Sequence, residues 1–135
     1  MNAAEPTATD ALRTIIHPRP EVRGTLTVRE LAKVMADNDC SAVIVTKRNG
    51  THAVATERDV VVALARDLDP DDDWAVDVMS VDLRTLNADA PIAAAAQLML
   101  DSVIRHVVVV DESSNELSIV SIRDLLGPFL TSLSD

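Results

Sequence analysis

Residues 53–60 read A-V-A-T-E-R-D-V, and residues 118–125 read S-I-V-S-I-R-D-L. In both, an apolar run leads to Thr or Ser, two further residues and Asp, which is typical of a strand that passes into a helix. The match extends backwards, where V-R-E-L-A-K-V-M-A-D at 28–37 aligns with I-A-A-A-A-Q-L-M-L-D at 92–101, and A-V-I-V-T at 42–46 with H-V-V-V-V at 106–110. The chain therefore holds two copies of one unit, and tandem copies usually cover each other's hydrophobic faces.

The first copy predicts a helix, two strands and a second helix. Residues 28–37 repeat apolar residues at helical spacing, and Thr27 with Glu30 has the spacing of a capping box. Two β-branched or apolar runs, 42–46 and 52–56, flank an Asn-Gly turn. A helix should follow over 58–66, and its predicted apolar face consists of Val61, Leu64 and Ala65.

The second copy predicts the same order of elements. Asp89 has the position of an N-cap for the helix at 92–101, with Pro91 near its first turn. Strands at 106–110 and 117–121 should enclose a polar turn, and a helix should follow over 122–133. Gly127-Pro128 predicts a break or a kink in that last helix.

Composition and charge restrict the classes of function. Hydrophobic residues make up 47% of the 135 residues but Trp74 and Phe129 are the only aromatics, so the core must be aliphatic. The net charge of −10 opposes binding to nucleic acid and to anionic membranes. The single cysteine excludes an internal disulfide. Neither a signal peptide nor an apolar run of ~20 residues is present, so we expect a cytoplasmic protein without a membrane span.

The repeats divide the chain into four segments. We expect a flexible N-terminus at 1–14, a first repeat at 15–67, a linker at 68–78 and a second repeat at 79–132. The linker contains the acidic run Asp-Pro-Asp-Asp-Asp, which predicts an exposed turn.

Four motifs at repeat spacing resemble those of the cystathionine β-synthase (CBS) domain family. They are V-M-S at 78–80, I-R-H-V-V-V-V-D at 104–111, T-E-R-D at 56–59 and S-I-R-D at 121–124. The resemblance covers nearly the whole chain and identifies it as similar to a stand-alone tandem CBS pair, or Bateman module. It implies an α/β (α+β) fold, with two βαββα-type repeats packed about a pseudo-twofold axis.

The same resemblance implies a ligand and the residues that contact it. CBS pairs hold adenosine-containing ligands such as AMP, ADP, ATP or S-adenosylmethionine in clefts between the repeats. The Thr or Ser of each final turn contacts phosphate, and the Asp three residues later accepts from the ribose hydroxyls. The implied site residues are Thr56, Arg58, Asp59, Leu86, Arg105, His106, Ser121, Arg123 and Asp124, with Val22 and Leu86 as walls for the base.

Each of these residues also has a structural interpretation. Thr56 and Ser121 are good N-caps, and an Asp in the first helical turn complements the helix dipole. The arginines suit either a phosphate or a nearby carboxylate, and His106 suits a strand. The family often has Gly where this chain has Ala53 and Ser118, and Pro where it has Val108, so side chains at 53 and 118 are expected to narrow the clefts.

The expected function is regulatory. The module should sense an adenine nucleotide without any required cofactor, form a homodimer and signal to a separate, unidentified protein. The alternative is a dimeric interaction scaffold whose clefts are vestigial. Enzymatic activity is not expected, because His17, His52 and His106 are scattered and no nucleophile–base pair or metal cluster stands out.

Overall fold

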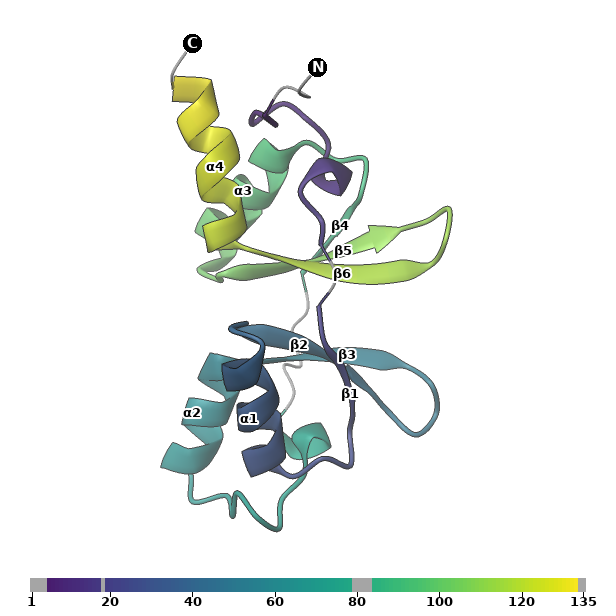
Figure 1. Cartoon of the computed structure of the whole chain (residues 1–135), viewed down its shortest axis with the longest axis vertical. Helices are drawn as coiled ribbons and strands as arrows, with labels where there is room; N and C mark the ends of the chain where they lie inside the picture. Colours follow the sequence, from purple (N-terminus) through teal and green to yellow (C-terminus); the bar gives the residue numbers. More distant parts are fainter. Residues whose placement is uncertain (1–4, 18, 79–83, 134–135) are drawn as a thin grey trace. The chain divides into compact units, whose positions relative to one another are not determined.

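A computed structural model describes residues 5–17, 19–78 and 84–133 of the chain. The chain forms two compact units (Figure 1). One unit is Arg19–Leu83, and the other joins Met1–Pro18 to Arg84–Asp135. The segment that precedes the first repeat therefore belongs to the unit of the second repeat.

The unit of the first repeat is a three-stranded sheet with two helices on one face (Figure 1). Its strands lie in the order β1-β2-β3, with β1 parallel to β2 and β2 antiparallel to β3. Its elements are β1 (Glu21–Arg23), α1 (Val28–Asp37), β2 (Ala42–Thr46), β3 (His52–Thr56), α2 (Glu57–Ala65) and the 3-10 helix η2 (Ala75–Asp77). The capping box predicted at Thr27 and Glu30 begins α1.

The unit of the second repeat has the same topology. The order is β4-β5-β6, with β4 parallel to β5 and β5 antiparallel to β6. Its elements are η1 (Leu12–Thr14), β4 (Thr85–Asn87), α3 (Ile92–Ser102), β5 (His106–Asp111), β6 (Glu116–Ser121) and α4 (Ile122–Leu133). The predicted α+β class and the β-α-β-β-α order of each repeat are confirmed.

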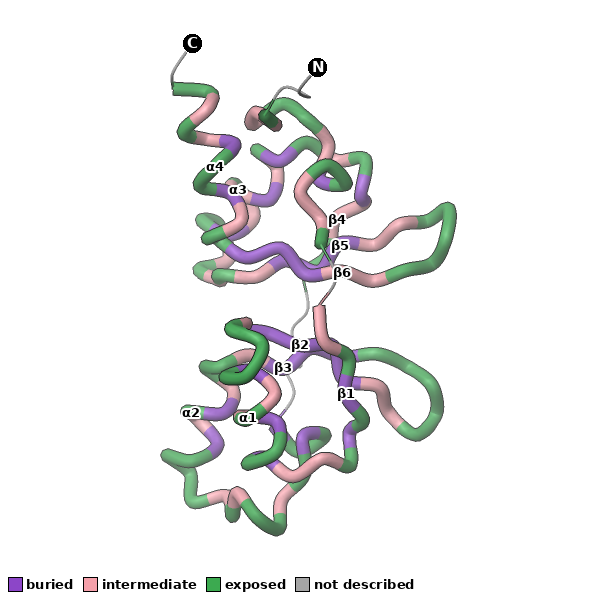
Figure 2. The backbone as a smooth tube through the Cα atoms, in the orientation of Figure 1, coloured by how far each residue is buried: buried purple, intermediate pink, exposed green. Residues whose placement is uncertain are grey.

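Each unit has its own aliphatic core between its sheet and its helices (Figure 2). In the first, Val43 and Val45 of β2 face Leu31 and Met35 of α1. In the second, Val107 and Val109 of β5 pack with Ile92 and Met99 of α3, and Phe129 lies partly buried against this core. The β-branched strand residues and small helix residues supply the core that the composition predicts.

Helix α2 buries a different face from the one predicted. Val60 and Ala63 contribute to the core, whereas Val61 is 64% exposed and Leu64 is 48% exposed. Almost every residue of this helix after Asp59 is apolar, so spacing alone did not distinguish its faces. The residues that face the core are set by the position at which α2 begins, which is Glu57, directly after β3.

The predicted N-cap at Asp89 is wrong. Pro91 occupies the N-cap position of α3 and provides no side-chain cap. Instead, the carbonyl oxygens of Asp10 and Ala8 accept from the amides of Ile92 and Ala93, at 2.8 Å each. Backbone from a distant segment thus satisfies amide groups that a helix leaves unpaired at its start.

Residues 5–17, here called the N-terminal segment, pack on the second repeat. Leu12 is fully buried in that repeat's core, and its amide donates to the Ala90 carbonyl at 2.8 Å. This differs from the flexible N-terminus predicted for 1–14, of which residues 1–4 lie outside the described residues. The polar composition of this segment predicted a flexible terminus. A single buried leucine and main-chain hydrogen bonds produce no hydrophobic periodicity that the sequence could reveal.

The predicted linker has the matching role in the first repeat. The carbonyl oxygens of Asp73 and Pro70 accept from the amides of Val28 and Arg29, at 2.9 and 2.8 Å. Ala75 of η2 is fully buried in the first core. Each repeat is therefore completed by the segment that precedes the other repeat in the sequence.

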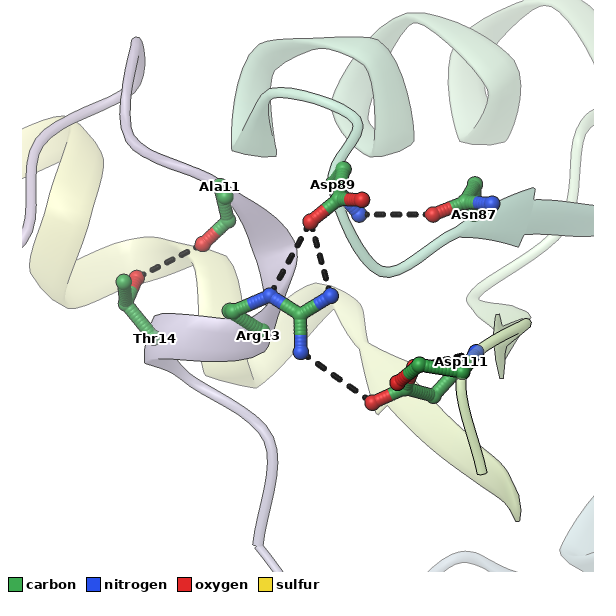
Figure 3. Close-up of polar contacts among 7 residues, drawn as sticks. Ala11, Arg13, Thr14, Asn87, Asp89 and Asp111 are labelled. Atoms are coloured by element: carbon green, nitrogen blue, oxygen red, sulfur yellow. Dashed lines mark hydrogen bonds and ion pairs between the residues drawn. The ribbon is translucent and has the colours of Figure 1, made fainter. Parts of the chain in front are cut away.

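Arg13 ties the N-terminal segment to two elements of the second repeat (Figure 3). Its Nη2 lies 2.7 Å from Asp89 Oδ1, and its Nη1 lies 3.1 Å from Asp111 Oδ2. The hydrogen bonds to these carboxylates raise the pKa of Arg13. On Asp111, hydrogen bonds from Ser113 and then from Arg13 hold the carboxyl pKa below its usual value.

The last helix continues through the predicted break. Pro128 lies inside α4 and is buried, while Gly127 is exposed. The hydroxyls of Thr131 and Ser132 donate to the carbonyls of Gly127 and Pro128, at 2.9 and 3.0 Å. No helix among the described residues has the length and apolar character that crossing a membrane requires.

Candidate functional site

The Ser121–Asp124 turn joins β6 to α4. Asp124 Oδ2 accepts from the Ser121 amide at 2.8 Å and from the Ser121 hydroxyl at 3.0 Å. The Asp124 amide lies 3.4 Å from Ser121 Oγ. Ser121 is buried, and the Asp124 side chain is 16% exposed. The turn therefore presents a carboxylate, held in one orientation, at the start of a helix.

The Thr56–Asp59 turn has the same geometry in the first repeat. The Thr56 amide donates to Asp59 Oδ2 at 2.8 Å, and the Asp59 amide donates to Thr56 Oγ1 at 3.2 Å. These reciprocal bonds form a capping box, so the structural interpretation of both motifs is realised. A carboxylate offers about four lone-pair positions, so accepting the capping bonds does not exhaust its capacity to bind a ligand.

Strand pairing brings Arg105 and His106 to the second turn. His106 pairs with Ser121 across β5 and β6, and the Ile122 amide donates to the Arg105 carbonyl at 2.9 Å. In the first repeat, Ala42 pairs with Thr56, and the Glu57 amide donates to the Ser41 carbonyl at 2.9 Å. The two turns are thus built alike, but only the second has a cationic residue at the strand start.

Arg58 and Arg123 occupy the same position in the two turns. Both are exposed, one residue before Asp59 and Asp124. No described residue forms an ion pair with either of them. Their guanidinium groups are therefore available to an anionic ligand.

Val22 and Leu86 face away from the turns. Val22 is paired with Val45 and belongs to the first core, and Leu86 is paired with Val109 and packs against the second. This placement differs from their predicted role as walls for the base. Successive side chains of a strand point to opposite faces, and these two lie on the helix-facing side.

The alternation of side chains between the two faces of a sheet also locates Ala53 and Ser118, which stand where the family often has glycine. Ala53 is paired with Val45 and Ser118 with Val109, so both lie on the helix-facing side of their sheets. Thr56 and Ser121 lie on the opposite side, because each comes three positions after Ala53 or Ser118 and successive side chains of a strand alternate between faces. The cleft narrowing expected at 53 and 118 stays a prediction. Val108, where the family often has Pro, shares the face of His106 and is paired with Ile119.

His17 is a candidate site residue that the sequence did not indicate. Its Nε2 lies 3.6 Å from Asp124 Oδ1, and its side chain is 56% exposed. The contact arises because the N-terminal segment packs on the second repeat, and no local pattern around His17 predicts that. No group of acidic, His or Cys side chains among the described residues is arranged to hold a metal ion.

Comparison with protein families assigns the chain to one family. The model of the CBS domain matches residues 8–66 and 75–129, so the chain belongs to the CBS-domain family. An uncharacterised protein of Methanopyrus kandleri is 33% identical over 104 residues, covering 76% of this chain and 53% of that protein. An uncharacterised 17.7 kDa protein of Acidianus ambivalens is 31% identical over 112 residues, covering 81% and 66%. The chain thus spans about half to two thirds of these relatives.

Solved structures share the fold. A CBS domain protein from Pyrobaculum aerophilum, complexed with AMP, is 30% identical and superposes with a TM-score of 0.78 over 92% of this chain and 96% of its own. A CBS domain protein of unknown function from Thermoplasma acidophilum has a TM-score of 0.79 at 21% identity, over 87% of this chain and 67% of its own. The tandem CBS assignment is confirmed.

Proposed function

We propose that this protein is a regulatory module that binds an adenosine-containing nucleotide at the Ser121–Asp124 and Thr56–Asp59 turns. The observation that carries the proposal is the fixed carboxylate at each strand-to-helix turn. The Asp suits two sugar hydroxyls, and the exposed arginines beside it suit a phosphate. The similar protein from Pyrobaculum aerophilum was solved with AMP, which supports this ligand class.

The second turn is proposed as the stronger site. Arg105, His106 and Arg123 accompany Asp124, whereas the matching positions beside Asp59 are Ser41, Ala42 and Arg58. With a net charge of −10, local cations decide whether an anionic ligand binds. One charge-assisted hydrogen bond is worth roughly 1.5–3 kcal/mol, which is about a ten- to hundredfold change in affinity. AMP, ADP, ATP and S-adenosylmethionine are all candidates, and none is required as a cofactor.

A homodimer is proposed as the functional form. Helices α3 and α4 leave a groove of about 440 Å³, lined by Met99, Leu100, Leu126 and Phe129 among others. Leu100 is 75% exposed and Leu126 is 57% exposed. Exposed apolar side chains in one continuous groove favour burial against a second copy. Ligand binding would then alter the assembly that a separate partner protein recognises.

The alternative is an interaction scaffold that binds no nucleotide. The apolar groove favours it, because a groove can serve a partner whether or not the turns hold a ligand. CBS-domain pairs are generally regulatory rather than catalytic proteins, and we propose no catalytic step.

Calorimetry with AMP and UMP tests the proposed function. We expect AMP to bind and to raise the melting temperature, since a ligand that binds only the folded state stabilises it. UMP should bind more weakly, because adenine offers a larger surface to bury. Equal binding of AMP and UMP would contradict the preference for adenosine, and binding of no adenosine ligand would favour the scaffold.

A further inference from the structure

His17 ends the described part of the N-terminal segment and faces two oxygen acceptors. Its Nδ1 lies 3.2 Å from the Ile15 carbonyl oxygen, and its Nε2 lies 3.6 Å from Asp124 Oδ1. The other oxygen of this carboxylate, Oδ2, accepts from the Ser121 amide and hydroxyl. The ring of His17 therefore lies beside Asp124 Oδ1, the oxygen that does not accept the Ser121 hydrogen bonds.

The strength of the contact between His17 and Asp124 depends on whether the His17 ring is protonated. A neutral imidazole has one N–H and satisfies one of two acceptors, while an imidazolium donates at both nitrogens. The ion pair with Asp124 therefore belongs to the protonated ring, and the neutral ring presents a lone pair to one of the two oxygens. Arg105 and His106 on β5 and Arg123 on α4 are further charged or titratable groups at this turn.

This inference rests on the proposed nucleotide site and concerns its regulation. We propose that His17 competes with the ligand's sugar hydroxyls for Asp124 Oδ1, so that protonation of His17 weakens the binding of the sugar at the second turn. The effect is modest, because an exposed ion pair contributes only about 0.2–1 kcal/mol.

The position of His17 in the chain gives the competition a consequence beyond the turn. The N-terminal segment caps α3 through Ala8 and Asp10 and inserts Leu12 into the second core. Two residues after His17, at Arg19, the chain enters the other unit. A sugar that displaces His17 would therefore remove a contact at the end of the segment that completes the second repeat.

Calorimetry with adenosine at about pH 5.5 and about pH 8 tests the competition. Adenosine has no phosphate, so no group of the ligand titrates in this range. We expect roughly two- to fivefold weaker binding at the lower pH, the effect of one exposed ion pair. The His17→Gln variant should show no such difference. Its affinity for adenosine at both pH values should equal that of the parent at the higher pH. A pH difference that persists in His17→Gln, or weaker binding by His17→Gln at both values, would overturn the proposal.

His52→Gln is the matched control, because His52 Nδ1 lies 3.4 Å from Glu21 Oε1 in the other unit. This variant should show the same difference in adenosine affinity between the two pH values as the parent. If His52→Gln lost that difference, the proposal would also be overturned. The ligand-free contact is measured separately, from the NMR signals of the His17 ring at about pH 5.5 in the parent and in Asp124→Asn. Unchanged His17 signals would overturn the contact. Absence of adenosine binding in every variant would overturn the proposed site and the competition with it, while the ring signals would still decide whether the contact exists.

Discussion

Asp59 and Asp124 each combine a structural role with a proposed binding role. Their capping bonds to Thr56 and Ser121 hold the carboxylates in place, which lowers the entropy that a ligand must remove when it binds. Substitution of either aspartate should therefore affect folding as well as binding. The two effects can be separated, because an asparagine still accepts a capping bond but lacks the charge.

We expect Asp124→Ala to abolish most AMP binding and to cost about 0.5–2 kcal/mol of unfolding free energy, the usual cost of losing an N-terminal cap. Asp59→Ala should cost similar stability but retain most AMP binding. Asp124→Asn should retain the stability of the parent and still lose binding. Chemical denaturation and calorimetry on the three variants measure both effects. Equal losses of binding in Asp59→Ala and Asp124→Ala would indicate two equivalent sites.

At the scale of elements, the N-terminal segment is part of the second repeat's core. We expect Leu12→Ala to destabilise that unit by about 2–5 kcal/mol, because it removes a fully buried side chain and leaves a cavity. Leu133→Ala, at a residue that is 81% exposed, is the control and should change stability little. Urea denaturation followed by hydrogen exchange would locate the loss. A loss equal to that of the control would mean that the segment does not pack on the second repeat in solution.

Arg13 makes the stability of the same region depend on pH. The pKa of Asp111 is lowered in the folded state by Ser113 and then by Arg13, so its stabilising contribution is present above the unfolded pKa of about 3.9. That contribution is lost as the pH falls through the lower folded pKa. Arg13→Ala should therefore reduce stability at pH 7 and show a smaller further loss on acidification to about pH 3.

Urea midpoints at the two pH values for Arg13→Ala and the parent measure this difference. Arg29→Ala is the control, since Arg29 makes an equivalent ion pair with Asp71 in the other unit. It should leave the acid sensitivity of the second repeat unchanged. An identical acid response in Arg13→Ala and the parent would show that Arg13 contributes nothing measurable to the Asp111 carboxylate.

At the scale of the whole molecule, the exposed apolar surface of α3 and α4 should determine the assembly. We expect the parent to be a dimer in light scattering at tens of micromolar, on the order of common assay concentrations. Leu126→Glu should produce monomers, because a charge placed in the groove would be buried without a partner in the dimer. Val76→Glu, on η2 of the other unit, should remain dimeric. A monomeric parent, or a dimeric Leu126→Glu variant, would contradict this interface.

Local pattern predicted the elements of the fold well. The strands at 42–46 and 52–56, the helix at 28–37 and the capping box at Thr27 all depend on contacts within a few residues. The Thr56 and Ser121 turns were found for the same reason. The face of α2 was predicted wrongly, because a helix that is apolar on all sides takes its orientation from the sheet beneath it.

Repetition and short-range spacing can be read directly along the chain, so the amino-acid sequence was enough to predict the two repeats, their element order, the aliphatic core and the two Asp-containing turns. Other features are visible only in the folded chain: each repeat is completed by the segment preceding the other, Arg13 joins Asp89 to Asp111, and His17 contacts Asp124. These contacts join residues 41 to 107 positions apart, mostly through main-chain groups and exposed charges. Such groups have no periodicity, so their partners are specified only when the hydrophobic cores have placed the segments together.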